Sequence, residues 1–406
     1  MKYVLVIGDG MADYPVPELA GKTPLQVACK PNMNSIAAEG RSGLLKTIPD
    51  SCPAGSDTAI LSVLGYKPDQ LRIGRGALEA AARGIKLEQH DAAFRCNLIT
   101  EENGVLADYS AGHITTKEAG QLIAAVKDAL EKPGEIEFYS GLDYRHFLVM
   151  RDLPNPELIE CALPHDVIGQ RIEAVLPKAK SKKVEKATQL LRKTILDSKP
   201  ILEAHPVNIA RRKAGKRMGN MVWPWGGGSK PSMPTFKEQF GLRGAVISAV
   251  DLVKGIGLYA GMQVIKVPGA TGMYDTNFEG KAQAALKALE ANDFVFVHVE
   301  APDEAGHERD YVKKVKAIED LDKRFLGQLL KGLREPYAIA VSPDHPTPIT
   351  VGTHTRDSVP FAIKSPFLAS DGVQKFDEIS ARSGGFGLVE DRSLVSLLIA
   401  AGKKGK

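Results

Sequence analysis

The sequence is poor in cysteine and in long hydrophobic runs. Its four cysteines (Cys29, Cys52, Cys96 and Cys161) form no CxxC pair, which favours reduced thiols over a disulfide framework and excludes a structural thiolate zinc site. No apolar run approaches the roughly 18–20 residues that span a bilayer. The apolar residues 3–7 near the N-terminus are too few for a signal peptide. We therefore expect a cytoplasmic protein with no membrane partner.

The chain also lacks a strong charge of either sign. A net charge of +4 over 406 residues is too small to indicate a nucleic-acid partner. The most basic stretch, residues 178–217, has no interleaved aromatic residues, so it is typical of a solvated helix face or of an anion-binding surface. Composition is ordinary for a soluble enzyme, with 43% hydrophobic and 25% charged residues. The length exceeds what one hydrophobic core usually fills, which predicts two domains.

Carboxylates and histidines follow three apolar runs that are typical of buried strands. Residues 3–7 lead to an aspartate between two glycines, residues 294–299 lead to an aspartate and a histidine four apart, and residues 337–341 lead to an Asp-His pair and a later histidine. Ligands of open α/β sheets lie beyond the carboxyl ends of strands. Oxygen and imidazole groups suit zinc, manganese or magnesium, and their number predicts two ions. These candidate metal ligands are Asp9, Asp303, His307, Asp344, His345 and His354.

Two further polar residues have competing interpretations. Ser56, in Pro-Ala-Gly-Ser-Asp before an apolar helical pattern, lies where helix N–H groups favour an anion, but by position alone a helix N-cap is the simpler interpretation. His298 lies inside the predicted strand at 294–299, and we interpret it as a packed core histidine.

The sequence pattern changes between about residues 100 and 228, and the glycine run 226–228 is typical of a hinge. After it, alternating strand-like and helix-like segments follow again. We predict an α/β core of a mostly parallel sheet flanked by helices, formed by residues 1–85 and 229–406, with a smaller α+β lid domain inserted at residues 86–228.

The motifs GDGMADYP, PAGSD, GRGALEAAARGI, VPGATGMYDT, HVEAPDEAGH and PDHPTP followed by THT together resemble the cofactor-independent phosphoglycerate mutases, in the short form common in archaea. That family belongs to the alkaline phosphatase superfamily. The resemblance runs from about residue 1 to residue 365. It implies an alkaline-phosphatase-like core, and an isomerase that interconverts 3-phosphoglycerate and 2-phosphoglycerate through a phosphoserine.

The resemblance also implies a division of the ligands between two divalent ions, most often manganese, with magnesium, zinc or cobalt as alternatives. One ion would be held by Asp303, His307 and His354. The other would be held by Asp9, Asp344, His345 and the hydroxyl of Ser56. Ser56 would then be the nucleophile, since coordination to a divalent ion lowers the pKa of a hydroxyl.

The inserted domain would supply cations and an acid/base for a small phosphorylated hydroxy acid. We expect Arg145, Arg211 and Arg95 from that domain and Lys254 from the core to bind the substrate, because guanidinium groups grip carboxylates and phosphates. His113 is the expected acid/base. The Asp-Gly-Arg-Asp type motif of the longer mutases is absent from the sequence.

Two other activities share such a centre. Some short-form relatives are proposed homoserine kinases, although the sequence has no GxxxxGK[ST] loop for ATP. A metal-dependent phosphatase would need a site open to water, which an insertion able to close as a lid disfavours. The sequence specifies neither the metal nor the oligomeric state.

Overall fold

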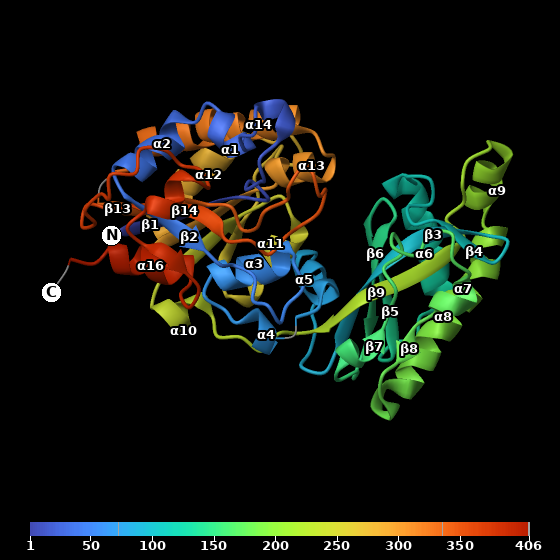
Figure 1. Ribbon diagram of the computed structural model, residues 1–406. Coiled ribbons are helices and arrows are strands. Elements are labelled where there is room, and N and C mark those ends of the chain that lie inside the picture. The colour runs from blue at the N-terminus through green and yellow to red at the C-terminus, as the bar shows by residue number, and fades with distance from the viewer. Residues whose placement is uncertain (72, 335, 405–406) are drawn as a thin grey trace. The chain divides into compact units, whose positions relative to one another are not determined.

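The computed structural model describes residues 1–71, 73–334 and 336–404. Its contacts divide the chain into two compact units. The first combines Met1–Leu71 with the part of the chain from Met233 onward, and the second is the segment between them (Figure 1). The predicted fold class is confirmed, since a large, mostly parallel α/β sheet is interrupted in sequence by a smaller α+β unit.

The first unit is built on an eight-stranded sheet in the order β11-β10-β12-β1-β13-β14-β2-β15. The first five of these strands are mutually parallel, and β14 is antiparallel to both of its neighbours. The strands are β1 (Lys2–Gly8), β2 (Arg41–Leu45), β10 (Gly244–Ile247), β11 (Gln263–Ile265), β12 (Phe294–Val299), β13 (Tyr337–Ser342), β14 (Val359–Lys364) and β15 (Gly387–Val389).

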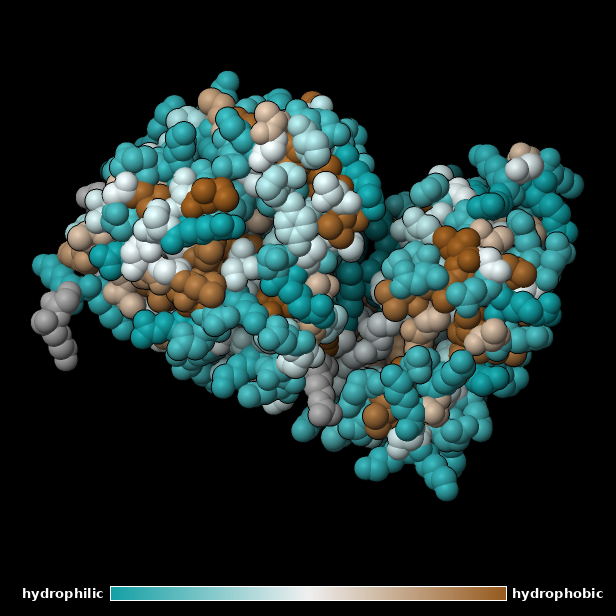
Figure 2. Space-filling view, viewed as in Figure 1, coloured by the Kyte–Doolittle hydropathy of each residue, from teal (hydrophilic) through white to brown (hydrophobic). Residues whose placement is uncertain are grey.

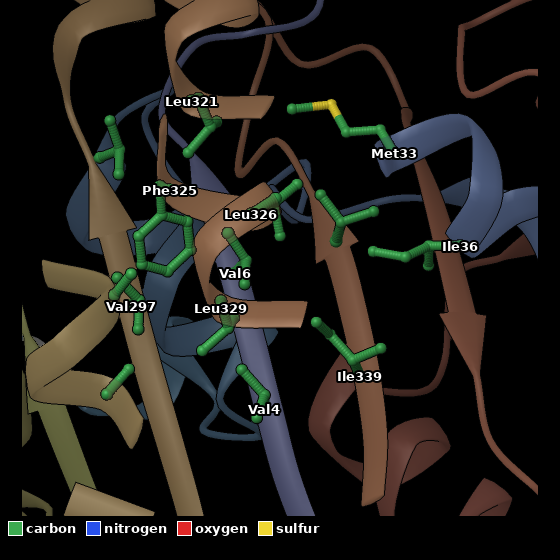
Figure 3. Packing of buried hydrophobic residues seen from close by; sticks show 14 of the residues in the cluster. Val4, Val6, Met33, Ile36, Val297, Leu321, Phe325, Leu326, Leu329 and Ile339 are labelled. Carbon is green, nitrogen blue, oxygen red and sulfur yellow. The ribbon is translucent and has the colours of Figure 1, made fainter. Parts of the chain in front are cut away.

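Apolar helices cover both faces of this sheet, which is why its central strands are hydrophobic throughout. Figure 3 shows one face, where Val4, Val297 and Ile339 from three neighbouring strands pack against Phe325 and Leu329. The helices of this unit are α1 (Pro24–Val27), α2 (Pro31–Ala38), α3 (Ser56–Val63), α4 (Pro68–Leu71), α10 (Phe236–Phe240), α11 (Asp251–Tyr259), α12 (Phe278–Ala291), α13 (Ala301–His307), α14 (Tyr311–Asp320), the π-helical turn Leu321–Leu326, α15 (Gly327–Gly332) and α16 (Leu394–Ala401).

The second unit has its own antiparallel sheet and its own core. The sheet order is β4-β3-β6-β5, and β9 pairs with β3 along the edge opposite β6. The elements are β3 (Ala92–Glu102), β4 (Val105–Asp108), β5 (Ile136–Leu142), β6 (Arg145–Met150), β9 (Met221–Ser229), the short pair β7 (Ile159–Glu160) and β8 (Lys178–Ala179), and the helices α5 (Arg75–Ala82), α6 (Thr116–Leu130), α7 (Ile172–Val175), α8 (Glu185–Ala204) and α9 (Pro206–Lys213).

The boundaries of the second unit differ from the predicted limits of 86 and 228. Helix α5 packs on β3 and β9, so the contacts assign it to the second unit. The glycine run 226–228 lies inside β9, where a Cβ on Gly227 would meet Phe94 at 2.3 Å and one on Gly228 would meet Gly74 at 2.5 Å. The run is therefore a site of close packing within the unit. The roles of the two units as core and lid stay a prediction.

The surface visible in Figure 2 is mostly hydrophilic, and its hydrophobic residues lie in small groups. None of the helices in the described part of the chain has both the length and the apolar character needed to cross a membrane.

Candidate metal centre

The candidate ligands all lie in the first unit, at the carboxyl end of its parallel strands. Strands β12, β1 and β13 are neighbours in the sheet. Asp9 follows β1, and Asp303 and His307 lie on α13 after β12. Asp344 and His345 follow β13 after one intervening residue. Because parallel strands end at the same edge, this topology brings side chains about 300 residues apart in sequence into one cluster.

One group of ligands surrounds Asp303. Ligand atoms of Asp303, His345 and His354 lie within 4.8 Å of one another. His307 adjoins them, with its Nε2 3.1 Å from Asp303 Oδ2 and 3.0 Å from His354 Nε2. Hydrogen bonds from His307 and His354 hold the pKa of the Asp303 carboxyl well below its usual value, although burial alone would raise it. The same contact with Asp303 raises the pKa of His307 to about 9.

The other group surrounds Asp9. Ligand atoms of Asp9, Asp344 and His298 lie within 4.8 Å of one another. His345 links the two groups, since its Nε2 is 3.3 Å from Asp9 Oδ1 and 3.5 Å from Asp344 Oδ2. Burial, reinforced by the negative charge of Asp344, raises the pKa of Asp9 well above its usual value.

Three carboxylate oxygens in this cluster are buried without a hydrogen-bond partner among the described residues. They are Asp9 Oδ1, Asp344 Oδ2 and Glu300 Oε2. A buried carboxylate oxygen without a donor is costly unless a cation neutralises it. Carboxylate and imidazole ligands suit divalent ions, so the residues present fit a divalent metal centre. How the ligands divide between ions, and which ions bind, stays a prediction.

Ser56 lies at the edge of this cluster. Its Oγ is 3.1 Å from His345 Nε2. It is the first residue of α3, and the N-cap position belongs to Gly55, without a side-chain cap bond. The interpretation of Ser56 as an N-cap is therefore wrong, and its hydroxyl faces an imidazole of the metal cluster.

His298 and Glu300 belong to the same cluster. His298 is buried in β12, as the interpretation of a core histidine requires, but its Nε2 is 2.9 Å from Asp9 Oδ2. Burial lowers the pKa of His298 to about 4. Glu300, one residue beyond β12, contributes a carboxylate to a group with Asp9 and Asp303. Burial and the Asp303 charge raise its pKa to about 8. The signal for Glu300 was available, because it directly follows an apolar strand.

His113 and Arg145 share a hollow on the second unit. The hollow is lined by His113, Ile114, Thr115, Thr116, Lys117, Asp143, Tyr144 and Arg145. The Arg145 guanidinium stacks on Tyr144 at 5.0 Å, and its side chain is 49% exposed. His113 has a φ of 50°. Residues other than glycine seldom adopt this backbone conformation, and where they do it often marks a functional loop. Arg145 also lies 3.9 Å from the Asp143 carboxylate, and binding of substrate by Arg145 and His113 stays a prediction.

The other three predicted substrate ligands have internal partners. Arg211 is buried and donates to Glu118, to the Ala111 carbonyl and to the Arg217 carbonyl. Arg95 is buried against Trp225 at 4.4 Å and pairs with Glu79 at 3.3 Å. Lys254, on α11 of the first unit, lies 3.0 Å from Asp251. The geometry of Arg211 and Arg95 favours structural roles, and their contact with substrate stays a prediction.

A buried carboxylate–imidazole cluster at the carboxyl end of a parallel sheet defines the class of metal-dependent α/β enzymes. Comparison with known proteins specifies the family. Residues 37–208 match the family described as 2,3-bisphosphoglycerate-independent phosphoglycerate mutase, and residues 170–349 match the type I phosphodiesterase / nucleotide pyrophosphatase family. The 2,3-bisphosphoglycerate-independent phosphoglycerate mutase of Methanosarcina barkeri is 51% identical, with 99% of this chain and 100% of that protein covered.

Solved structures agree with these sequence matches. A protein from Pyrococcus horikoshii is 31% identical with a TM-score of 0.85, covering 100% of this chain and 99% of that one. The cofactor-independent phosphoglycerate mutase of Thermoplasma acidophilum is 29% identical with a TM-score of 0.71, covering 99% of this chain and 100% of that one. The chain belongs to the 2,3-bisphosphoglycerate-independent phosphoglycerate mutase family, as the sequence motifs predicted.

Proposed function

We propose that this protein interconverts 3-phosphoglycerate and 2-phosphoglycerate by moving the phosphoryl group through Ser56. One observation supports this reaction most strongly. The Ser56 hydroxyl lies 3.1 Å from His345 Nε2, at the edge of a cluster in which three buried carboxylate oxygens have no hydrogen-bond partner among the described residues. The names of the relatives that match over nearly the whole chain support the same reaction.

Asp303, His307 and His354 would hold one divalent ion, and Asp9, Asp344, His345 and Ser56 would hold the other. When bound, such ions lower the pKa of a hydroxyl and neutralise the charge of phosphoryl oxygens. We expect manganese, with magnesium, zinc or cobalt as alternatives.

The chain's own residues would then act in two transfers. In the first, Ser56 Oγ gives up its proton and forms a bond to the phosphorus of 3-phosphoglycerate, the bond from phosphorus to the 3-oxygen breaks, and that oxygen takes a proton. In the second, the 2-hydroxyl of the retained glycerate gives up its proton and accepts the phosphoryl group, the bond from phosphorus to Ser56 Oγ breaks, and Oγ takes a proton again. Positioning and charge neutralisation dominate such reactions.

The hollow on the second unit would bind the substrate and handle its protons. Arg145 and Lys117 carry positive charge beside His113. We assign the substrate's anionic groups to the two cations and proton transfer to the imidazole of His113. Arg211 donates to the carbonyl of Ala111, two residues before His113, which suits a role in holding this loop.

Purified protein given manganese and 3-phosphoglycerate should form 2-phosphoglycerate without 2,3-bisphosphoglycerate or ATP, and a chelator should abolish the reaction. A phosphatase would instead release inorganic phosphate as fast as substrate disappears. A homoserine kinase would form product only when homoserine and a phosphate donor are both present. Either of these results, without 2-phosphoglycerate, would replace the mutase assignment.

A further inference from the structure

Thr347 lies between the two halves of the metal centre without being a candidate ligand. It follows β13 by five residues and is fully buried. Its hydroxyl Oγ1 makes a short hydrogen bond to Asp303 Oδ1, and the same oxygen is 3.3 Å from His345 Nδ1. Thr347 therefore contacts one residue of the Asp303 group and the histidine that links this group to Asp9.

The chemistry of the three groups fixes the direction of these bonds. An ionised carboxylate can only accept, so Thr347 gives its single hydroxyl proton to Asp303. Toward His345 the hydroxyl oxygen can then only accept. The carbonyl of Pro346, 3.4 Å from the same Nδ1, is likewise an acceptor. Both neighbours therefore require a proton on Nδ1 of His345.

That tautomer determines what His345 presents to the site. With the proton on Nδ1, the lone pair of the neutral ring is on Nε2. Nε2 is the atom that faces Ser56 Oγ at 3.1 Å, Asp9 Oδ1 at 3.3 Å and Asp344 Oδ2 at 3.5 Å. This lone pair can accept the Ser56 hydroxyl proton, and beside two carboxyl groups it is also the form of the ring that a divalent cation would bind.

The backbone around Thr347 is held in place on several sides. Lys314, fully buried on α14, donates to the Thr347 carbonyl at 2.8 Å, and the Thr347 N–H donates to Ala12 at 3.3 Å. A Cβ on Gly10 would come within 2.6 Å of the Thr347 hydroxyl, and one on Gly306 within 2.4 Å of its carbonyl. The hydroxyl therefore has little freedom to turn away from Asp303 and His345.

We propose that Thr347 is a positioning residue that orients Asp303 and fixes the Nδ1–H tautomer of His345, and so prepares both halves of the centre for metal at once. The inference shares with the proposed function only the assignment of the metal ligands, and it involves no substrate. Loss of hydrogen bonds around metal ligands typically weakens metal binding by about 10–100-fold.

Metal affinity of matched variants tests the inference. Thr347→Val keeps the shape of the side chain but removes the hydroxyl, Thr347→Ser keeps the hydroxyl, and Thr350→Val changes an exposed threonine of the same loop. Titration of metal-free protein with Mn²⁺ should show about 10–100-fold weaker binding for Thr347→Val. Thr347→Ser should bind much more tightly than Thr347→Val, and Thr350→Val should match the wild type. Equal affinity of Thr347→Val and the wild type, with both folded, would overturn the inference.

A second measurement uses the unaltered side chain at 347. In ¹⁵N-labelled metal-free wild-type protein, histidine ring spectra should show His345 protonated at Nδ1, with the signal assigned from its absence in His345→Gln. The Nε2–H tautomer there would overturn the inference even if Thr347→Val failed to fold. Neither measurement uses phosphoglycerate, so a wild type without mutase activity would refute the proposed function and leave this test standing.

Discussion

At the scale of single residues, His354 offers the clearest test of the ligand assignment. It lies on a loop, its side chain is 22% exposed, and its Nε2 contacts His307 and Asp303 at 3.0 and 3.6 Å. His354→Ala should therefore preserve the fold but lose about one bound ion per chain, because one of three ligands is removed. Elemental analysis after dialysis against Mn²⁺ measures the loss. His90→Ala, at an exposed position of the second unit, should keep the full metal content; unchanged metal in His354→Ala would contradict the assignment.

Ser56 carries the chemistry in the proposed reaction. Ser56→Ala removes the attacking oxygen, so the mutase rate should fall by several orders of magnitude, and 3-phosphoglycerate should still bind through the cations of the second unit. Ser62→Ala changes a serine of the same helix whose Oγ donates to the Thr58 carbonyl, and this variant should keep nearly full activity. A coupled assay for 2-phosphoglycerate, with calorimetry for binding, separates the two effects. A Ser56→Ala enzyme of normal rate would exclude the phosphoserine route.

The sequence predicted more of the cluster than of its surroundings. Asp9, Asp344 and the other candidates were visible because each polar residue follows an apolar strand. His298 is buried as predicted, but its contact with Asp9 was not foreseen, because strand periodicity marks a position as buried and does not tell what the buried atom faces. The internal partners of Arg211 come from α6 and the loops around Ala111 and Arg217, and such contacts depend on packing that no local pattern encodes.

At the scale of elements, a buried ion pair holds α14 to the loops of the metal centre. Lys314 Nζ lies 2.7 Å from Asp13 Oδ2, and both side chains are fully buried. Lys314→Met should cost roughly 3–5 kcal/mol of unfolding free energy, because the Asp13 charge would remain buried without its partner. Urea denaturation of metal-free protein measures this cost.

Two comparisons make the Lys314 prediction specific. Lys316→Met removes a lysine on the same helix that is 64% exposed and paired with Asp320, and it should change stability by less than about 1 kcal/mol. Adding Asp13→Asn to Lys314→Met should restore part of the lost stability, since the unpaired charge disappears. An equal loss in the Lys314 and Lys316 variants would show that burial of the pair is unimportant.

In the second unit, Glu137 of β5 and Arg151, the residue after β6, form a pH-dependent pair. The ion pair and its hydrogen bonds with Arg151 lower the pKa of Glu137 to about 2, from a usual value of 4.5. Because the folded-state pKa is the lower one, the stabilisation is complete above pH 4.5 and is lost as the pH falls toward 2. Glu137→Gln should therefore cost roughly 1.5–3 kcal/mol at pH 7.

The difference between Glu137→Gln and the wild type should shrink steadily when unfolding is measured at successively lower pH between 4.5 and 2. Glu135→Gln alters a neighbouring carboxylate that is 54% exposed and paired with Lys132, and its effect should stay below about 1 kcal/mol at every pH. A constant difference for Glu137→Gln across this range would mean that the carboxylate charge does not stabilise the strands.

At the scale of the whole molecule, the inserted arrangement was predictable and its limits were not. Candidate metal-ligand motifs on both sides of a segment with a different sequence pattern indicated one domain interrupted by another. The limits were missed because α5, an alanine-rich helix, has no local feature that tells which sheet it covers. In the structure Ala77 and Ala80 pack with Ala93, Phe147 and Val149 of the second unit.

The second unit should therefore fold by itself, provided that α5 is included. Strands β3 and β9 are paired in its sheet, and the pairing of Ala92 with Ser229 brings the two ends of the segment together. It also has a hydrophobic core of its own, built on β3, β5, β6, α6 and α8. A fragment of residues 72–232 should show cooperative thermal unfolding by circular dichroism and dispersed amide signals by NMR.

A fragment of residues 86–232, which begins at the predicted boundary, is the matched comparison. It lacks α5 and exposes the apolar side chains of Ala93, Phe147 and Val149 that this helix covers. Exposing this surface weakens the fragment by the hydrophobic free energy of the lost contacts, on the order of 25 cal/mol per Å². The shorter fragment should therefore melt at a clearly lower temperature or aggregate. Equal melting temperatures for the two fragments would place the boundary at residue 86 and assign α5 to the first unit.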